Sequence, residues 1–371
     1  MTDVEIGRGK RGRVTYSFDD VAVAPSRRTR DADEVSTAWQ IDAYRFQAPI
    51  IAAPMDSVVS PETAITLNGL GVLAVLNLEG LWTRYADPRP QLDRIRELPS
   101  HEAIAYLQHA YGDQPVDPAL ITERVKQMRD GGATVAVAVS PQAAAQLAPH
   151  AVAAGIDLLV IRGTTVSAEH VSSNGAPLNL KTFIYELEVP VIVGGCATYQ
   201  AALHLMRTGA AGVLVGFGGG AALTTSDVLG IRVPMASAVA DVAAARRDYL
   251  DESGGRYVHV IADGAVGSSG ALVKAIACGA DAVMIGSVLA RASDSPGRGE
   301  HWGPEAWHRS LPRGERKHLG VVGTFEQILH GPSSTADGSS NIVGALRKAM
   351  ATTGYSDIKE FQRIDVILDP H

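Results

Sequence analysis

Short runs of aliphatic residues recur along the chain and alternate with alanine-rich stretches. The runs are apolar throughout, without a regular polar alternation, which is typical of parallel strands buried on both faces. We expect eight strands, at residues 49–53, 71–76, 134–139, 157–161, 190–194, 212–216, 257–263 and 281–286. The stretches between them carry Ala and Leu at helical spacing, as in helices that pack on a sheet, for example at 140–154, 198–208 and 269–278.

The ends of the predicted helices fit the same alternation. Five of the eight strands follow a helix that ends at a glycine, which is a common way to stop a helix before a strand. Eight repeats of strand and helix favour a closed barrel over an open, doubly wound sheet. We therefore predict an α/β fold in which residues 1–371 form a single (β/α)8 TIM-barrel domain, with its strands at about 49–286.

Two stretches interrupt the alternation. Residues 81–129 contain prolines and polar helical segments, and we interpret them as an insert made of a loop with one or two extra helices. Residues 291–340 are rich in Gly, Pro, Ser and charge and follow the last strand, where barrel enzymes place lids. We interpret this second stretch as a candidate flap that precedes a final helical segment and tail.

Composition narrows the class of protein. Hydrophobic residues make up 46% of the chain, yet no segment approaches the apolar run of about 18 residues that a membrane span needs. The N-terminus lacks the apolar core of a secretory signal, so we predict a soluble, cytoplasmic protein without a membrane partner. The net charge of −7 argues against a specific nucleic-acid partner. Two cysteines, Cys196 and Cys278, indicate reduced thiols, with neither a disulfide framework nor a structural metal site.

The ends of the seventh and eighth strands carry a pattern suited to phosphate binding. The seventh ends in Asp263, Gly264 and Ala265, and the eighth in Gly286 and Ser287. Small residues let the backbone approach an anion, a hydroxyl adds a donor, and a carboxylate accepts hydrogen bonds from two ribose hydroxyls. In barrels, phosphate often binds between these two loops. The alternative is that both loops merely turn the chain and cap a helix.

A glycine-rich loop follows the sixth strand, at residues 216–225. Gly216, Gly218 and Gly220 suit a backbone that needs positive φ angles or that converges on a ligand or cation. The match to a dinucleotide-binding fingerprint is weak, because the loop does not lie in a first strand-to-helix turn. A mobile loop without a ligand is the alternative.

Several segments, taken in order, make the chain resemble the IMP dehydrogenase and GMP reductase family, and more narrowly its short members that lack CBS domains. They are SFDDVAVAPS (17–26), APMDSV (53–58), PVIVGGCAT (190–198), VGFGGGAALTT (215–225), VIADGAVGSSG (260–270) and the tail from NIVGALRKAM. This resemblance implies a parallel barrel that binds IMP, GMP or XMP at the C-terminal ends of its strands, with NAD or NADP as cofactor. It also implies a homo-oligomer, a tetramer or an octamer.

The resemblance also assigns roles to individual residues. Met55 would lie against the purine, Asp263 would hold the ribose, and Gly286 with Ser287 would bind the 5′-phosphate. Thr225 matches a threonine near the reacting centre. The loop of Gly216, Gly218 and Gly220 would shape the catalytic and cofactor site, and in many relatives its carbonyls also bind a monovalent cation.

The chain departs from the family pattern where the chemistry needs it most. The family uses a cysteine thiolate that adds to the purine, and the matching residue here is Leu223. An acidic residue that usually meets the cofactor is Arg162, an asparagine after the fifth strand is Gly195, and a serine of the glycine loop is Ala221.

Two further sets of residues bear on the chemistry. Cys196 directly follows the fifth strand, so we consider it as a surrogate nucleophile, against the plainer interpretation of a small buried side chain. Two arginines and three histidines lie in the candidate flap, and we interpret them as solvated lid residues: Arg313, Arg316, His301, His308 and His318.

These observations leave two main functions open. One is an NAD(P)-linked oxidoreductase of purine nucleotide metabolism that uses an altered mechanism. The other is a catalytically inactive, purine-nucleotide-binding paralogue that regulates or assembles with an active enzyme. A third and weaker possibility, suggested only by the loops after the seventh and eighth strands, is a barrel that binds a sugar phosphate or a flavin. The retained phosphate loops fit both main functions, whereas Leu223 and Arg162 favour the second.

Overall fold

Eight parallel strands form a closed barrel at the centre of the molecule. The computed structural model describes residues 3–25, 27–170, 178–217, 220–222, 224–308 and 314–369. Around the barrel each strand pairs with its neighbours in chain order, and the last strand closes on the first. The strands are β6 (Ile50–Ala52), β7 (Leu73–Asn77), β8 (Ala136–Val139), β9 (Leu158–Arg162), β10 (Val191–Cys196), β11 (Gly212–Val215), β12 (His259–Asp263) and β13 (Ala282–Ile285). The predicted (β/α)8 barrel and all eight predicted strands are confirmed.

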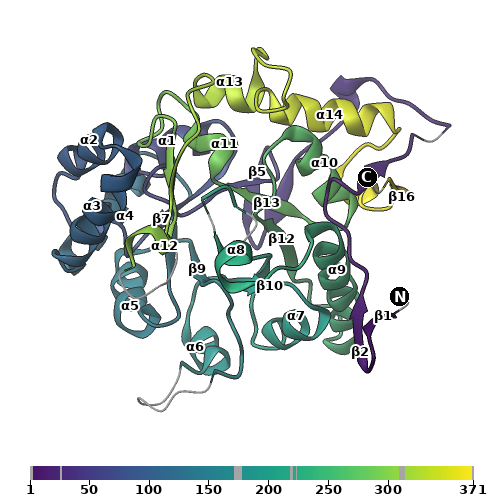
Figure 1. The fold of residues 1–371 in the computed structure, drawn as a ribbon, viewed down its shortest axis with the longest axis horizontal. Helices are drawn as coiled ribbons and strands as arrows, with labels where there is room; N and C mark the ends of the chain where they lie inside the picture. The colour runs from purple at the N-terminus through teal and green to yellow at the C-terminus, as the bar shows by residue number, and fades with distance from the viewer. Residues whose placement is uncertain are drawn as a thin grey trace.

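Helices surround the strands, and Figure 1 looks roughly along the barrel with this ring in view. The ring contains α1 (Pro61–Gly69), α4 (Pro118–Asp130), α5 (Ala144–Ala154), α6 (Leu180–Glu186), α7 (Tyr199–Met206), α9 (Met235–Glu252) and α10 (Ser269–Ala277). Three short helices lie among the loops that follow the strands: α8 (Thr225–Leu229), α11 (Ser287–Ala290) and α12 (Pro304–Trp307). The strands are apolar on both sides because helices cover one face and the barrel interior covers the other.

Local signals set where the helices begin and end. Ser60 caps α1 with its side chain and exchanges hydrogen bonds with Thr63, and Pro61 occupies the first turn, where a missing N–H costs nothing. Gly155 ends α5 in the left-handed conformation, with φ of 88°. The chain therefore turns from helix to strand where the sequence predicts it.

Three helices occupy most of the stretch 81–129. They are α2 (Arg89–Glu97), α3 (Ser100–Gly112) and α4, after a short 3-10 turn, η2 (Leu81–Thr83). Helix α4 lies in the ring, so α2 and α3 are the extra helices. Arg124 of α4 is buried and donates to the backbone carbonyls of Trp82 and Ala86, which fastens the start of the insert to the ring.

The stretch 291–340 carries ordered elements that pack against the barrel. Strand β14 (Glu300–Trp302) pairs in antiparallel fashion with β15 (Arg316–His318), and α13 (Phe325–His330) follows. Trp302 and Phe325 are fully buried. Much of the candidate flap is therefore packed structure, and opening of this segment stays a prediction.

The two ends of the chain form small sheets outside the barrel. Strand β1 (Asp3–Gly7) pairs with β2 (Lys10–Arg13), and β3 (Val21–Val23) pairs with β16 (Val366–Leu368). A third hairpin joins β4 (Trp39–Ile41) to β5 (Tyr44–Phe46). The remaining elements are η1 (Ala32–Glu34), α14 (Ile342–Thr352) and α15 (Ile358–Phe361). Within the described ranges, no helix is both long and apolar enough to cross a membrane.

A buried hydrogen-bond network joins the insert and the candidate flap to the barrel. Tyr111 of α3 donates to Asp56 Oδ2 at 2.5 Å, and Trp302 Nε1 donates to Tyr111 Oη at 2.9 Å. The Trp307 ring stacks on Tyr111 with 4.8 Å between centroids. Burial raises the pKa of Asp56 to about 6, although hydrogen bonds from Tyr111 and Leu81 oppose this shift.

We predict that Tyr111→Phe destabilises the protein by about 1–3 kcal/mol, because the buried Asp56 loses a donor and the Trp302 N–H loses its acceptor. Chemical unfolding followed by tryptophan fluorescence measures the change. Tyr106→Phe on the same helix is the control, since the structure records no hydrogen bond of its hydroxyl within the described residues. Equal unfolding midpoints for the two variants would show that the network contributes little.

Candidate functional site

The C-terminal ends of the eight strands meet at one mouth of the barrel. Asp263 is the last residue of β12, Arg162 is the last residue of β9, and Gly286 follows β13. Met55 follows β6, and Thr225 begins α8 with its side chain fully buried. The residues predicted from the sequence for the purine, ribose and phosphate therefore come from strand ends at the same mouth.

An ion pair crosses this mouth. Arg162 Nε donates to Asp263 Oδ2 at 2.9 Å, and the two side chains are 13% and 11% exposed. Strands β10 and β11 lie between β9 and β12, so the pair bridges separate parts of the barrel wall. Burial lowers the pKa of Arg162, but the nearby carboxylates of Asp263 and Glu305 outweigh it and raise that pKa overall. The guanidinium therefore stays charged. It is paired with one carboxylate oxygen of Asp263, the residue predicted to bind the ribose.

The backbone after β12 takes an uncommon conformation. Gly264 has a φ of 100°, and Ala265 has a φ of 57°, which is rare for a residue with a side chain. Such residues persist only where the surroundings enforce them, and they cluster at ligand-binding sites. On the neighbouring strand end, Ser287 begins α11. The two predicted phosphate loops thus lie on adjacent strands, β12 and β13, which pair in parallel.

His301 lies at the mouth, whereas the sequence-based interpretation placed it in solvent on the candidate flap. It is 2% exposed, and its Nδ1 lies 3.0 Å from the hydroxyl of Ser57. A Cβ on Gly286 would lie 3.1 Å from both His301 Cε1 and Met55 Sδ, so these side chains cover that glycine. Burial lowers the pKa of His301 to about 4, which makes it a neutral imidazole.

The interpretation of His301 as a solvated lid residue is therefore wrong. Strand β14 carries His301 and packs against the barrel, which no local sequence pattern indicates. Arg316 of the paired strand β15 is also buried, at 7% exposure, so the same interpretation is wrong for it, and Arg313 lies outside the described residues. The other two histidines of this stretch differ from it, since His308 borders a cavity at the mouth and the side chain of His318 is 72% exposed.

Close packing of strand ends explains two of the glycines. A Cβ on Gly216, whose φ is 119°, would lie 2.5 Å from the carbonyl oxygen of Asp263. A Cβ on Gly195 would overlap the carbonyl oxygen of Gly216. An asparagine therefore has no room at position 195 in this backbone.

The other residues of the glycine loop are described only in part. Gly220 is half-buried and Ala221 is exposed, while Gly218 and Leu223 lie outside the described residues. The predicted cation at this loop and the predicted role of Leu223 therefore stay predictions.

Cys196 is poorly placed to act as a nucleophile. It is 1% exposed, and its Sγ–H donates to the carbonyl oxygen of Leu214 at 3.4 Å. Burial raises the pKa of the Cys196 thiol to about 12. Because the thiolate is the reactive form, the structure contradicts the suggested surrogate role. The plainer interpretation, a small buried side chain, fits the observed packing.

A cavity of about 250 Å³ opens beside the ion pair. Glu79 lies on its wall, where the backbone N–H and the hydroxyl of Ser140 donate to its carboxylate at 2.6 and 3.0 Å. Thr164 Oγ1 lies 3.5 Å from Glu305 Oε1, and both residues also line the cavity. Polar groups from three strand ends and from α12 thus surround a space next to the guanidinium of Arg162.

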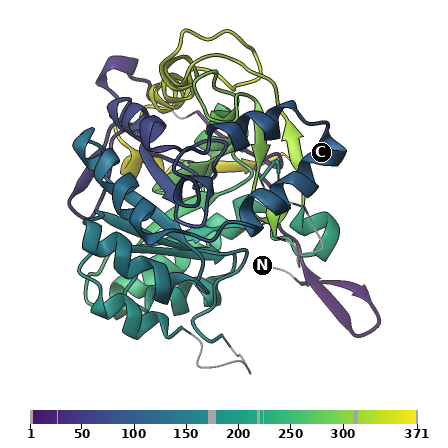
Figure 2. The ribbon, with the colours of Figure 1, turned by 90° about the vertical axis from the view of Figure 1, so that its left-hand side faces the viewer.

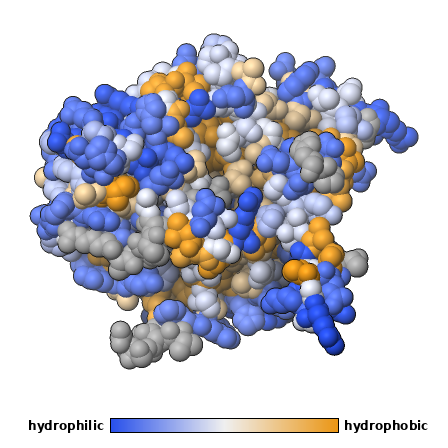
Figure 3. Space-filling view, in the orientation of Figure 1, coloured by the Kyte–Doolittle hydropathy of each residue, from blue (hydrophilic) through white to orange (hydrophobic). Residues whose placement is uncertain are grey.

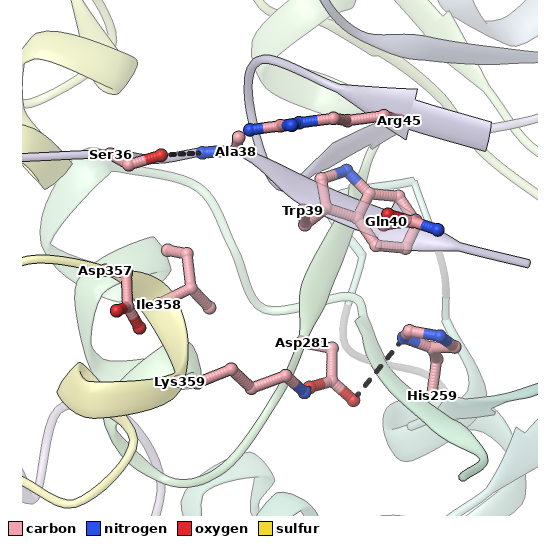
Figure 4. A pocket seen from close by; sticks show the side chains of 10 residues that line it. All are labelled: Ser36, Ala38, Trp39, Gln40, Arg45, His259, Asp281, Asp357, Ile358 and Lys359. Atoms are coloured by element: carbon pink, nitrogen blue, oxygen red, sulfur yellow. Dashed lines mark hydrogen bonds and ion pairs between the residues drawn. The ribbon is translucent and has the colours of Figure 1, made fainter. Parts of the chain in front are cut away.

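A larger cavity, of about 430 Å³, lies at the opposite end of the barrel (Figure 4). Asp281, just before β13, is almost fully buried there and accepts from Arg246 at 2.8 Å, from Tyr257 at 2.7 Å and from Lys359. Burial alone would raise the pKa of Asp281, but the two cations hold it well below its usual range. Since its oxygens are already occupied by protein donors, we interpret this network as structural, and the mouth as the candidate site.

Comparison with known proteins identifies the family of the chain. The family model described as "IMP dehydrogenase / GMP reductase domain" matches residues 15–306. The chain belongs to the IMP dehydrogenase and GMP reductase family. A crystal structure of an IMP dehydrogenase/GMP reductase-like protein from Corynebacterium glutamicum is 49% identical, with a TM-score of 0.93, and the match covers 99% of this chain and 97% of that one.

Relatives of similar length share the whole chain, not only the barrel. An uncharacterized oxidoreductase of Mycolicibacterium smegmatis is 56% identical over 369 residues, which cover 97% of this chain and 98% of that protein. An inosine-5′-monophosphate dehydrogenase of Thermoplasma acidophilum is 42% identical over 145 residues, 39% of this chain and 27% of that enzyme. The family resemblance stated from the sequence is thus confirmed, including the short form without CBS domains.

We predict that His301 makes the protein less stable in acid. Its folded-state pKa of about 4 lies below the ordinary value of 6.5, so between these values the unfolded chain binds more protons. The stabilising contribution is complete above about pH 6.5 and falls as the pH drops towards 4. Between about pH 7.5 and pH 5 this amounts to about 2 kcal/mol. His301→Gln should remove this part of the pH dependence of the unfolding free energy.

The comparison with wild type isolates His301 from other groups. Asp56 has a raised pKa and acts with the opposite sign over about pH 4 to 6, while the lowered pKa of His259 acts in the same direction as that of His301. His150→Gln, at an exposed position, is the control. An identical pH dependence for wild type and His301→Gln would refute the prediction.

Proposed function

We propose that this chain binds a purine nucleoside 5′-monophosphate across the barrel mouth and does not carry out the cysteine-dependent chemistry of its family. The observation that carries the proposal is the conformation of Gly264 and Ala265, which turns the backbone after β12 beside the β13 loop. A dianionic phosphate would bind between these loops through backbone N–H groups and the Ser287 hydroxyl. IMP, GMP and XMP are the candidate ligands.

The ribose and purine would be held by the neighbouring side chains. Asp263 pairs one carboxylate oxygen with Arg162, and its other oxygen has no recorded partner within the described residues, so that oxygen can accept from a ribose hydroxyl. Met55 is 6% exposed and packs beside Gly286, where its thioether suits the flat face of a purine.

Neither cysteine of the chain supplies a thiolate near neutral pH. Burial raises the pKa of Cys196 to about 12 and that of Cys278 to about 11. The chain has two cysteines in all, and Leu223 has no nucleophilic atom. Covalent addition to C2 of the purine, which divides the family's reaction into accessible steps, therefore has no nucleophile here.

The residues that the resemblance assigns to a nicotinamide cofactor do not fit it. A guanidinium only donates, so Arg162 cannot accept hydrogen bonds from ribose hydroxyls as a carboxylate does. Gly195 has no side chain and no room for one. We therefore derive no step through NAD or NADP. A monovalent cation at the Gly218–Gly220 loop remains part of the family expectation.

A second candidate function is an NAD(P)-linked oxidoreductase that uses another mechanism. The polar cavity beside Arg162 supports it, because it offers space for a second ligand next to the nucleotide. The relatives named as oxidoreductases point the same way. Under the first candidate function, the protein is an inactive paralogue that senses purine nucleotides in the cytoplasm. Under either candidate function, it is a homo-oligomer of four or eight subunits.

We predict that nucleoside monophosphates bind and that the corresponding nucleosides bind far more weakly, because the phosphate loops supply most of the polar contacts. Asp263→Ala should weaken nucleotide binding by about 1.5–3 kcal/mol, the usual loss for hydrogen bonds to a charged group. Calorimetric titration with IMP, GMP and XMP measures both effects. Asp248→Ala, an exposed carboxylate on α9, is the control. Equal affinity for inosine and IMP would remove the phosphate site from the proposal.

We also predict that the purified protein converts IMP with NAD, and GMP with NADPH, at no more than a trace rate. Loss of a catalytic nucleophile typically removes several orders of magnitude. Leu223→Cys alone should restore little, because Arg162 and Gly195 remain, and Cys196→Ala should change nothing. Both reactions are followed by the absorbance of the reduced nicotinamide, which rises when NAD is reduced and falls when NADPH is oxidised. Turnover of about 1 to 10³ per second in the native protein would favour the second candidate function.

A further inference from the structure

The first two strands form a hairpin that projects from the body of the molecule. We call residues 3–13 the arm, and Figure 2 shows it extending beyond the barrel and its helices. Its strands pair only with each other, with Asp3 opposite Arg13 and Glu5 opposite Arg11. A two-stranded hairpin without further cover is marginally stable in water. The arm therefore lacks the packing that such a structure normally needs.

Few contacts hold the arm to its own chain. Arg13 forms an ion pair with Asp241 of α9 at 2.6 Å, and just beyond the arm Tyr16 and Ser237 exchange hydrogen bonds. The outer part exposes two large apolar side chains, with Val4 at 49% and Ile6 at 73% exposure. These side chains gain hydrophobic free energy only if another surface covers them.

The arm also differs in charge from the rest of the chain. It holds four basic and two acidic side chains, so it carries +2, while the whole chain carries −7 and the remainder therefore −9. Arg8, Lys10 and Arg11 take part in no ion pair among the described residues. The net negative charge of a second copy of this chain would attract this basic arm.

One surface of the chain matches the arm in both respects. Strand β16 exposes three apolar residues, Val366, Ile367 and Leu368, at 37%, 50% and 56%. Among the described residues it pairs only with β3, along one edge, and Asp365 and Asp369 flank its two ends. An edge strand of this kind presents unpaired backbone groups that another strand can pair with. In Figure 3 apolar surface appears over the arm and over β16, on the same side of the molecule.

We propose that the arm of one copy docks on β16 of a second copy. The arm adds its edge to the small sheet of β3 and β16, its apolar side chains cover those of β16, and its basic residues lie near Asp365 and Asp369. Because arm and β16 lie on one side of the molecule, two copies related by a two-fold axis can exchange arms reciprocally. The inference is independent of the proposed nucleotide site.

The apolar content of the arm decides between partners. A basic arm that bound nucleic acid would use its charged groups on phosphates, and exposed Val4 and Ile6 would contribute nothing to that contact. A strand-to-strand interface uses both the apolar side chains and the charges. The observations therefore favour a second copy of the chain.

Sedimentation velocity of the full chain from about 1 to 100 µM tests the proposal, because the mass of an associating protein depends on concentration. Wild type should sediment as an oligomer, and Ile6→Glu and Ile367→Glu should each weaken its self-association at least about tenfold. Val321→Glu, another exposed apolar position, is the control and should leave the mass unchanged. Nucleotide binding by Ile6→Glu should match wild type, which separates this test from that of the proposed function. A monomeric wild type, or an unchanged mass for Ile6→Glu, would overturn the proposal.

A crosslinking experiment locates the contact. Ile6→Cys mixed with Ile367→Cys should give a disulfide-linked dimer under mild oxidation, and each variant alone should give much less. Cys196 and Cys278 are not exposed and add little background. Absence of the mixed dimer would contradict docking on β16. Binding of a labelled RNA oligonucleotide that is lost in Lys10→Glu, without any change of mass, would instead assign the arm to nucleic acid and overturn the proposal.

Discussion

Burial of the strands on both faces is the constraint on which the rest of this structure depends. Strands without a polar side must be covered by helices outside and by one another inside, and closure of the barrel satisfies both conditions. Closure also brings all eight C-terminal ends to one mouth. Asp263 and Arg162 contact each other, and Met55 lies at the same mouth, because each stands at or just after the end of a strand, although the chain separates them widely.

The Arg162–Asp263 pair determines which hydrogen-bond donors and acceptors that mouth offers to a ligand. A lone carboxylate offers acceptors to the hydroxyls of any ligand, whereas a carboxylate paired with a guanidinium is neutral overall and offers one free oxygen. On the β9 side the pair presents donors, where the family resemblance implies an acceptor. The loops that we propose to bind a nucleotide follow β12 and β13, whereas the positions that the family resemblance assigns to a cofactor hold Arg162 and Gly195. The proposed binding role rests on this contrast.

The fold could be predicted from the sequence, because strand burial and helix periodicity are local and repeat eight times. Part of the site followed from topology, since residues at strand ends must meet. His301 and the Tyr111–Asp56–Trp302 network did not follow, because they depend on how α3 and β14 pack on the barrel. Cys196 shows the same limit, since its position at a strand end was correct but its thiol points to the carbonyl oxygen of Leu214.

The close approach of Gly195 to Gly216 limits which residues can occupy position 195. Any side chain restored at position 195 meets the carbonyl oxygen of Gly216 before it can reach a ligand. That carbonyl in turn is held by a strand end that is packed against Asp263. A larger side chain at position 195 therefore requires the backbone after β11 to move, so a substitution of Gly195 alone destabilises the mouth of the barrel.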